Sequence, residues 1–569
     1  MFRPCRLTIL ALLIALSSRV ATGQQSSIVP AMHGVYDWLW TQRVFGRLSA
    51  FDRETLPTSR DVILGHLRTL AKDSAAMSAT DRGLLRDFLN EFDFDRLLEN
   101  GLFRSVEPTN IPASTLQALR QRKDPYLLAV RLPDSSFSGA IAVSVGLGNA
   151  YDRIVGDQAH YLSHSWGAFS AFVNSDMGLG ASVGIEKGEA RNGSSTQLFA
   201  LDSRFVGDWN YRMSQKALGA WHTEGWLSYA RKNLRVDYGT GFASYGPAVT
   251  DAILLRADAP NITQLRMRIG TEKIHYTFVH GALPAAPGTT FDSTISYDGH
   301  VARVGVRPGR WVAMHRLAWS PTPKLTLTGY EMVVYGGRGA DPRYVNPVYP
   351  IYASVDQDDP TNNDNGINGF DAVYRPTAGT EVYASALIDI ILDGKWSRLF
   401  SLGREDENVK AVWSVGLQQR LPFDVRLGVG YTRADPFAYT HYTQLSAWVV
   451  DGQPLGTAIG PNSDEWAVRL TRWLPMRSRF MVGARRIRNG LNPVGSADVG
   501  GDLMSPLDAS GVFMRGADVQ SYHRVELELD TEPLRGLKVT WKRSQSTTDR
   551  GTRIPSHTGT TFLRVSYGF

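Results

Sequence analysis

The sequence predicts a mainly β fold: a transmembrane antiparallel β-barrel of about 18 strands, preceded by a small N-terminal α-helical bundle. Three observations carry this prediction. Segments of about ten residues alternate between polar and apolar side chains, charged residues stand in the middle of these segments, and the chain ends on such a segment at Phe569. Strands of this kind present one face to lipid and the other to a lumen.

The composition is compatible with a membrane barrel, although it averages out as that of a soluble protein. The 569 residues are 43% hydrophobic and 20% charged, and the mean hydropathy is −0.21. Beyond the N-terminus no run of about 18 apolar residues occurs, which excludes a bundle of transmembrane helices. Alternation hides a membrane-facing surface from such averages, because every second residue of a strand is polar.

Residues 1–23 are predicted to be a secretory signal peptide. Arg3 and Arg6 form a basic start, Leu7 to Leu16 an apolar core, and Ala21-Thr22-Gly23 a small-residue cleavage site. The single cysteine, Cys5, precedes the apolar core, so the mature chain is predicted to have no disulfide and no Cys-based metal site. Three arginines and no acidic residue leave with this segment, so the net charge falls from +6 to +3, which is weak support for an anionic partner.

Residues 24–125 are predicted to form a helical segment that precedes the barrel. A first apolar stripe of helical spacing runs from Tyr36 to Leu48, and Pro57-Thr58-Ser59 supplies the start of a second helix. A third helix is expected to begin near Thr80-Asp81, where an N-cap oxygen satisfies free backbone N–H groups. Three short helices bury little apolar surface by themselves, so they need a larger body to pack against.

Residues 126–569 are predicted to be the barrel, because the period of the apolar residues changes to two. Val425, Leu427, Val429 and Tyr431 alternate with polar or small residues, and similar segments recur to the C-terminus. A soluble β-sandwich or propeller is the alternative, but its strands are usually shorter, about five to six residues. The last segment, Leu563 to Phe569, resembles the C-terminal strand signal by which the barrel-insertion machinery recognises bacterial outer-membrane proteins.

Several motifs stand where strands meet long connections, and they combine aromatic residues with Asn, Asp, Glu, Arg and His. Such mixtures suit sugars, which have apolar C–H faces and many hydroxyls, although the same residues also build turns. The motifs are YGTGFASYGP from Tyr238, HRL from His315, E-x3-YGG from Glu331, YVNPVYP from Tyr344, YTH from Tyr439 and GPNSDE from Gly460. The candidate polysaccharide-binding residues are Tyr245, Glu331, Arg338, Tyr344, Asn346, Tyr349, Tyr439 and His441.

The order of these motifs, together with the helical lead-in from Trp38 to Phe92, resembles the Wzi-type capsule assembly protein family over nearly the whole mature chain. The resemblance implies an outer-membrane barrel of about 18 strands with a helical bundle closing its periplasmic end. It also implies a surface lectin that holds capsular polysaccharide at the cell surface, with no catalytic residue set. Ser244-Tyr245-Gly246 departs from the family pattern, in which a Trp-Gly pair is expected.

Other interpretations of the same residues stay open. The arginines are interpreted first as partners of acidic residues across the lumen, and His315 with Glu331 as a structural network inside the barrel. The acidic segment Asp356–Asp371 fails the EF-hand spacing and is favoured as a solvated turn cluster, so no metal and no cofactor is expected. An outer-membrane hydrolase would use a Ser–His pair such as His315 near Ser320, but no G-x-S-x-G motif occurs.

The sequence therefore predicts a non-enzymatic protein of a Gram-negative outer membrane that binds surface polysaccharide through extracellular loops. The expected partners are that polysaccharide, outer-membrane lipid and the barrel-insertion machinery, with no nucleic acid, and the protein is expected to be a monomer. A porin or transport barrel for sugars or other small solutes is the alternative, because polar lumen faces also line conducting channels.

Overall fold

The computed structural model describes 25–99, 103–105, 124–132, 136–154, 160–191, 209–214, 217–284, 293–297, 300–304, 309–351, 364–391, 409–441, 443–450, 452–505, 511–549 and 556–568. The predicted signal peptide, residues 1–23, and the terminal Phe569 lie outside these ranges. So do residues 356–363, the first half of the acidic segment that is predicted to be a solvated turn cluster.

The barrel is closed, mainly β and antiparallel, with 18 wall strands, as the alternation predicts. Each wall strand pairs with its neighbour along the chain, and the last strand pairs with the first, from Thr558↔Ile154 to Gly568↔Ser144. Closure leaves no unpaired strand edge in the lipid, where no water is present to satisfy backbone groups. The C-terminal segment singled out in the sequence therefore completes the barrel.

The wall strands range from 8 to 18 residues. They are β4(Phe137–Ile154), β5(His160–Ser175), β6(Leu179–Arg191), β8(Ala217–Arg231), β9(Leu234–Gly241), β11(Ile262–Gly270), β12(Ile274–Leu283), β15(Arg310–Thr322), β16(Leu325–Gly336), β17(Asn365–Tyr374), β18(Thr380–Ile391), β19(Val409–Leu421), β20(Val425–Ala434), β23(Ser463–Leu474), β24(Ser478–Leu491), β25(Asp518–Leu534), β26(Leu537–Asp549) and β27(Ser556–Gly568).

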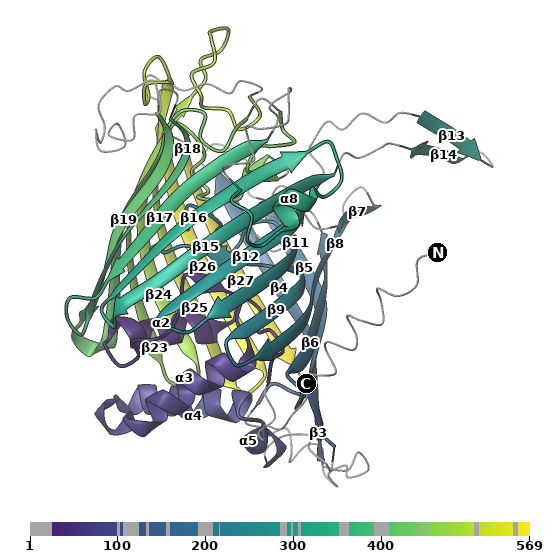
Figure 1. Cartoon of the computed structure of the whole chain (residues 1–569), viewed down its shortest axis with the longest axis vertical. Coiled ribbons are helices and arrows are strands. Elements are labelled where there is room, and N and C mark those ends of the chain that lie inside the picture. The colour runs from purple at the N-terminus through teal and green to yellow at the C-terminus, as the bar shows by residue number, and fades with distance from the viewer. Residues whose placement is uncertain are drawn as a thin grey trace.

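Several short strands pair with the wall strands or with each other. Two short strands, β2(Phe103–Ser105) and β3(Leu128–Arg131), pair in parallel, and β3 continues antiparallel onto β4. The strand β7(Trp209–Ser214) pairs with the far part of β8. Inside the barrel β1(Thr55–Leu56) pairs with β10(Ser244–Tyr245). The remaining pairs are β13(Ser293–Tyr297) with β14(His300–Val304), which projects away from the barrel in Figure 1, and β21(Val449–Val450) with β22(Gln453–Pro454).

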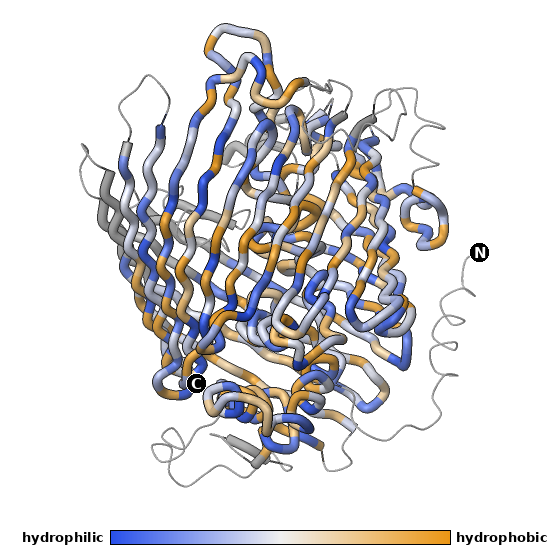
Figure 2. The backbone as a smooth tube through the Cα atoms, turned by 90° about the vertical axis from the view of Figure 1, so that its left-hand side faces the viewer, coloured by the Kyte–Doolittle hydropathy of each residue, from blue (hydrophilic) through white to orange (hydrophobic). Residues whose placement is uncertain are grey.

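The alternation divides each strand between an outward and a lumenal face, as expected. Along β20 the lumenal Arg426 is buried while Val425 and Leu427 on the other face are half-exposed. On β27 the outward Leu563 and Val565 are 42% and 39% exposed, whereas Arg564 between them pairs with Glu186 in the lumen. Figure 2 shows the same alternation as orange and blue steps along neighbouring strands. On these strands apolar side chains therefore face lipid and charged ones face the lumen.

The N-terminal helices gather at one end of the barrel, beside the tight turns between strands (Figure 1). They are α2(Gly34–Val44), α3(Arg60–Lys72), α4(Ala79–Phe92) and α5(Phe94–Glu99). Ser78 caps α4 by accepting a hydrogen bond from the backbone N–H of Asp81, so the helix begins slightly before the predicted Thr80-Asp81. Ser59 precedes α3 as expected, but its hydroxyl bonds Asp61 rather than a backbone N–H.

The helices bury their apolar faces against each other and against the barrel. One core cluster joins Trp38, Leu67 and Phe88 of the helices to Phe242 and Trp473 of the barrel. The ring of Trp38 lies 5.2 Å from that of Phe88, which in turn meets Trp473 at 6.4 Å. The larger body that the short helices require is therefore the mouth of the barrel itself. No helix among the described residues is long and apolar enough to span a membrane.

Candidate functional site

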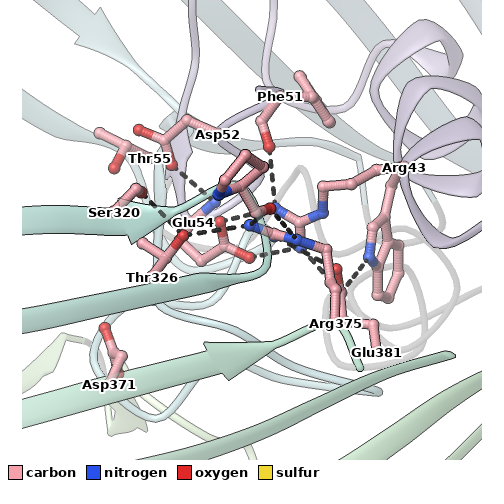
Figure 3. Close-up of polar contacts among 12 residues, drawn as sticks. Arg43, Phe51, Asp52, Glu54, Thr55, Ser320, Thr326, Asp371, Arg375 and Glu381 are labelled. Carbon is pink, nitrogen blue, oxygen red and sulfur yellow. Dashed lines mark hydrogen bonds and ion pairs between the residues drawn. The ribbon is translucent and has the colours of Figure 1, made fainter. Parts of the chain in front are cut away.

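The helical end of the barrel is fastened by a buried charge network around Arg43 of α2 (Figure 3). Its guanidinium donates to both carboxylate oxygens of Glu54, at 2.9 and 2.7 Å, and to Glu381 of β18 at 2.8 Å. Trp40 also donates its indole N–H to Glu381 at 3.0 Å. Arg43 and Glu381 are 2% and 3% exposed, so this fork of charge-assisted hydrogen bonds joins helix to wall without water between them.

Three further ion pairs hold the helices from other parts of the wall. Arg426 of β20 donates to the carboxylate of Asp37 at 2.5 Å. Glu91 of α4 accepts from Arg477 at 2.5 Å and from Arg535 at 2.9 Å. Burial alone would raise the pKa of the Glu91 carboxyl, but the neighbouring Arg477, His33 and Arg535 hold that pKa well below its usual range. The helices are thus tied to strands on several sides of the mouth.

Part of the lumen is filled by two segments that fold inward from the opposite end. Residues 243–259 and 438–455 supply a hydrophobic core that packs on the lumenal side chains of β11 to β20. Within it Tyr439 donates to the carbonyl of Ile253 at 2.8 Å, and Trp448 donates to the carbonyl of Leu254 at 2.7 Å. Arg310 of β15 bonds the carbonyl of Ala447 at 2.7 Å. We call this part of the barrel, β11 to β20 with the two segments, the filled side.

The remaining lumen is lined by charged side chains from β23 to β27 and β4 to β6, which we call the charged side. Arg479 pairs with Asp530 at 2.7 Å and with Glu528, and Arg564 pairs with Glu186 at 2.7 Å. These groups are partly exposed: the side chains of Arg479 and Asp530 are 29% and 32% exposed. Other members of this set are Arg485, Arg524, Glu526 and Lys542.

Residues 338–351, which we call the wall segment, lie on the outside of the barrel rather than over its opening. They follow β16 and include the short helix α8(Pro342–Val345). Tyr344 and Ile351 of this segment pack on Ala313 of β15 and on Tyr335 of β16, which point away from the lumen. Tyr276 of β12 fastens the segment by donating its hydroxyl to the carbonyl of Pro347. Figure 1 shows α8 in front of the strands.

Five of the eight predicted binding residues belong to this outer region. Arg338 forms a bidentate pair with Asp364, at 2.7 and 2.5 Å, and Tyr344 donates to the same carboxylate at 2.8 Å. Tyr344 is fully buried, whereas the side chain of Arg338 is 33% exposed. Glu331 is half-exposed, Asn346 is exposed and Tyr349 is half-exposed. The wall segment thus brings Arg338, Asn346 and Tyr349 to an accessible surface.

Glu331 and His315 contact each other, as the sequence suggested, but on the outer face rather than inside the barrel. The His315 Nδ1 lies 2.9 Å from Glu331 Oε1, and the same oxygen accepts the backbone N–H of Ile351 at 3.1 Å. The residues oppose each other in the β15–β16 register, where lumenal neighbours such as Arg316 alternate with them. The position was misjudged because period two identifies two faces without saying which one a single polar pair occupies.

The other three predicted residues are enclosed in the barrel. Tyr245 donates its hydroxyl to Gln264 at 2.9 Å and is 3% exposed. Tyr439 belongs to the core of the filled side, and the His441 Nδ1 lies 2.9 Å from the hydroxyl of Ser446. All three support the packing of the inward segments. In this arrangement their rings are covered by protein.

The charged side contains arginines paired with acidic residues across the lumen, as the sequence suggested, but none of the predicted binding residues. Its residues are not contiguous in sequence and so form no motif: some strands contribute a single charged residue, and others contribute charged residues at alternate positions. The available signal was the alternation of Glu526, Glu528 and Asp530 with apolar residues, which marks a lumenal face. Among the described residues no group of three His, Cys, Asp or Glu side chains is arranged to hold a metal ion.

Comparisons with known proteins identify both fold and family. The family model described as "Capsule assembly protein Wzi" matches residues 181–540. A solved structure with the same overall fold is Wzi of Escherichia coli, described as an outer membrane protein involved in group 1 capsule assembly and a carbohydrate-binding β-barrel. It has a TM-score of 0.54 and 12% identity, and the match covers 94% of this chain and 99% of that chain.

Two porin-like barrels are less similar. OccAB4 of Acinetobacter baumannii has a TM-score of 0.40 and 10% identity, over 75% of this chain and 98% of its own. OprD of Pseudomonas aeruginosa has a TM-score of 0.39 and 10% identity, over 75% and 95%. A search of curated protein sequences finds no match to the chain. Because the Wzi family model matches more than half of the chain, this outer-membrane barrel belongs to the Wzi family of capsule assembly proteins.

Proposed function

We propose that the protein is a lectin-like protein of the outer membrane that binds capsular or another surface polysaccharide and tethers it at the cell surface. The observation that carries this proposal is the double closure of the barrel. The helices occupy one mouth of the barrel, which we take to be the periplasmic one, and the core of the filled side occupies part of the lumen. In a protein of the capsule assembly family, a barrel closed in this way favours a surface role over transport.

The accessible part of the predicted set lies on the wall segment. Arg338, Asn346 and Tyr349 combine a guanidinium, an amide and an aromatic ring, which suits the hydroxyls, carboxylates and C–H faces of acidic sugars. Each such contact is individually weak. A polymer repeats the same unit many times, so weak contacts at several protein molecules add up to firm retention. The buried Tyr344 is proposed to support this surface by packing, whereas Tyr245, Tyr439 and His441 are proposed to support the inward segments.

The remaining parts of the proposal concern the partners. We infer a monomer, since the barrel closes within one chain, and contact with outer-membrane lipid along the outward apolar face. The C-terminal strand, β27, completes the barrel by pairing with β4, which supports its role as the segment read by the insertion machinery. We also propose that residues 1–23 are a signal peptide, residues 24–125 a periplasmic plug and residues 126–569 the barrel.

Deletion of the gene, followed by measurement of cell-bound and shed capsule, tests the proposal. We expect the shed fraction to rise on deletion and to return to the normal level when the gene is restored. Restoration with Asn346→Ala combined with Tyr349→Ala should leave the shed fraction raised. The matched control is Val494→Ala, an exposed residue outside the predicted set. Normal retention of the polysaccharide in the deletion strain would contradict the tethering function.

A porin is the second candidate, and the charged side is the observation that favours it. Its half-exposed ion pairs resemble a polar lining through which small solutes pass. Reconstitution in planar bilayers separates the two functions. We expect closed membranes with rare, brief openings, because the helices block the mouth. Steady open channels would contradict the plugged lectin and establish transport.

We propose no catalytic activity. The hydrolase considered from the sequence would use His315, which in the structure pairs with Glu331, while Ser320 contacts Thr326 at 3.0 Å. Lipid turnover by the purified protein, measured with and without the substitution His315→Ala, tests this point. A turnover that this substitution abolishes would overturn the non-enzymatic proposal.

A further inference from the structure

A groove on the outer wall of the barrel differs from the rest of the lipid-facing surface. It has a volume of about 440 Å³ and lies where β5, β6, β8, β9 and β11 are neighbours. The residues that line it on the outward face form two adjacent rows of the strand register. They are Val173, Ala181, Leu227 and Tyr238 in one row and Ala171, Val183, Gly225, Thr240 and Thr263 in the other.

The exposure of the side chains shows that the groove opens outward and not into the lumen. Leu227 and Tyr238 are 62% and 55% exposed. Their neighbours along the strands, Trp226 and Asp237, are buried on the lumenal face. The groove is thus part of the same surface that contacts lipid around the barrel, and a hydrocarbon chain reaches it without leaving the membrane.

Gly225 explains why the wall is hollowed here. A side chain at this position would have no atom within 4 Å of its Cβ, so the floor of the groove is open above the backbone. Gly225 is also the last residue of β8 that pairs with β9, opposite Thr240. Beyond it β8 continues to Ala217, whereas β9 ends at Gly241, so the two strands part at the groove.

The chemistry of the lining selects an apolar ligand. Along its outward rows the Thr240 and Thr263 hydroxyls lie 2.7 Å apart, so these two groups satisfy each other. A sugar placed here would lose hydrogen bonds to water that the lining does not replace. A hydrocarbon chain loses none and buries apolar surface against Leu227 and Tyr238. The volume also falls in the range of small-molecule sites, about 300–1,000 Å³.

We propose that this groove is a binding site for one acyl chain of an outer-membrane lipid, held in a fixed position on the wall. The site is separate from the proposed polysaccharide surface and does not depend on it. Its ligand crosses the strands obliquely, because the two lining rows run across strands that are tilted by about 35–45° in such barrels. Filling the floor at Gly225 abolishes the site.

Photo-crosslinking tests the proposal with the full-length protein. The protein is reconstituted into vesicles of phosphatidylethanolamine that carry a diazirine in one acyl chain, and labelled residues are found by mass spectrometry. Tyr238 in the groove is compared with Tyr374, an outward tyrosine of β17 that is 46% exposed. We expect at least a fivefold greater yield at Tyr238 than at Tyr374, since a held chain stays in contact longer than a passing one.

Two substitutions complete the test. Gly225→Leu fills the floor of the groove and should bring the labelling ratio of the two tyrosines to about one. Gly329→Leu is the matched control, because Gly329 is also outward and also has no atom within 4 Å of an added Cβ. It should leave the ratio unchanged. Equal labelling of both tyrosines in the unmodified protein, or an unchanged ratio in Gly225→Leu, would overturn the proposal, and neither result bears on polysaccharide retention.

Discussion

The interior of the barrel is stabilised differently on its two sides. On the filled side the lumenal side chains of β11 to β20 are buried under apolar segments, with Val334 and Val412 fully covered. On the charged side Arg479, Lys542 and their acidic partners remain partly exposed and neutralise each other. The lumen of this barrel is therefore not uniform in composition. One half is packed like the core of a soluble domain, and the other half is stabilised by ion pairs beside water.

The largest expected effect comes from the core of the filled side. Trp448→Ala removes a buried ring and leaves the carbonyl of Leu254 without its indole donor. We expect a loss of about 5 kcal/mol in the free energy of unfolding and a lumen that conducts ions. Trp466→Ala is the control, because Trp466 is 56% exposed on the outer face. Urea unfolding and single-channel recording measure both effects, and equal losses for the two variants would contradict the comparison.

The next effect concerns how the helices are fastened to each side. Arg43→Met leaves the buried Glu54 and Glu381 without their shared guanidinium. We therefore expect the free energy of unfolding to fall by about 3–4 kcal/mol. Arg477→Met should cost less, because Arg535 still pairs with Glu91. Limited proteolysis of the helices reports the difference. If Arg477→Met released the helices more readily than Arg43→Met, the charged side would be the stronger attachment.

Acid should loosen the helices before it affects the barrel. Burial lowers the pKa of His66 in α3 to about 4, although nearby Asp52 acts in the opposite direction. His66 therefore takes up a proton less readily in the folded state than in the unfolded state, in which its pKa is about 6.5. The stability that the neutral His66 contributes to the folded state is fully present above pH 6.5 and is lost as the pH falls toward 4. At pH 5 we expect the free energy of unfolding to be about 2 kcal/mol lower than above pH 6.5.

The substitution His66→Gln should remove this dependence. Protease sensitivity of the helices at pH 5 and pH 7.5 is the measurement. Unchanged acid sensitivity in the variant would assign the effect to other groups of the same unit, such as His33, whose pKa burial also lowers despite the opposing charge of Glu91.

The smallest effect is expected on the charged side. Glu528→Gln removes a carboxylate whose partners, Arg479 and Lys542, are 29% and 47% exposed. We therefore expect the free energy of unfolding to fall by at most about 1 kcal/mol. Asp371→Asn on the filled side is the matched variant, because Asp371 and Arg316 are 2% and 1% exposed. It should cost about 3 kcal/mol. Similar costs for both substitutions would show that the two sides do not differ in access to water.

The closure of the barrel and its helical lead-in followed from local patterns. Alternation predicted β20 and β27, since a strand with one face in lipid must change polarity at every residue. The helices followed from apolar stripes of helical spacing and from start signals: Ser59 precedes α3 as predicted, whereas the cap of α4 is Ser78 rather than the predicted Thr80-Asp81. The binding residues were harder. Tyr439 and Tyr349 stand in similar aromatic motifs, yet one is buried in the filled side and the other lies on the outer wall.

The period of each segment can be read from local sequence, and with it the strands, the helices and the two faces of the wall. Local polarity is enough for that, because lipid and water sort side chains residue by residue. The inward turn of residues 243–259, 438–441, 443–450 and 452–455, and the outward turn of the wall segment over Tyr335, are visible only in the folded chain. These choices depend on contacts between segments as far apart as Ile253 and Tyr439, which no local pattern records.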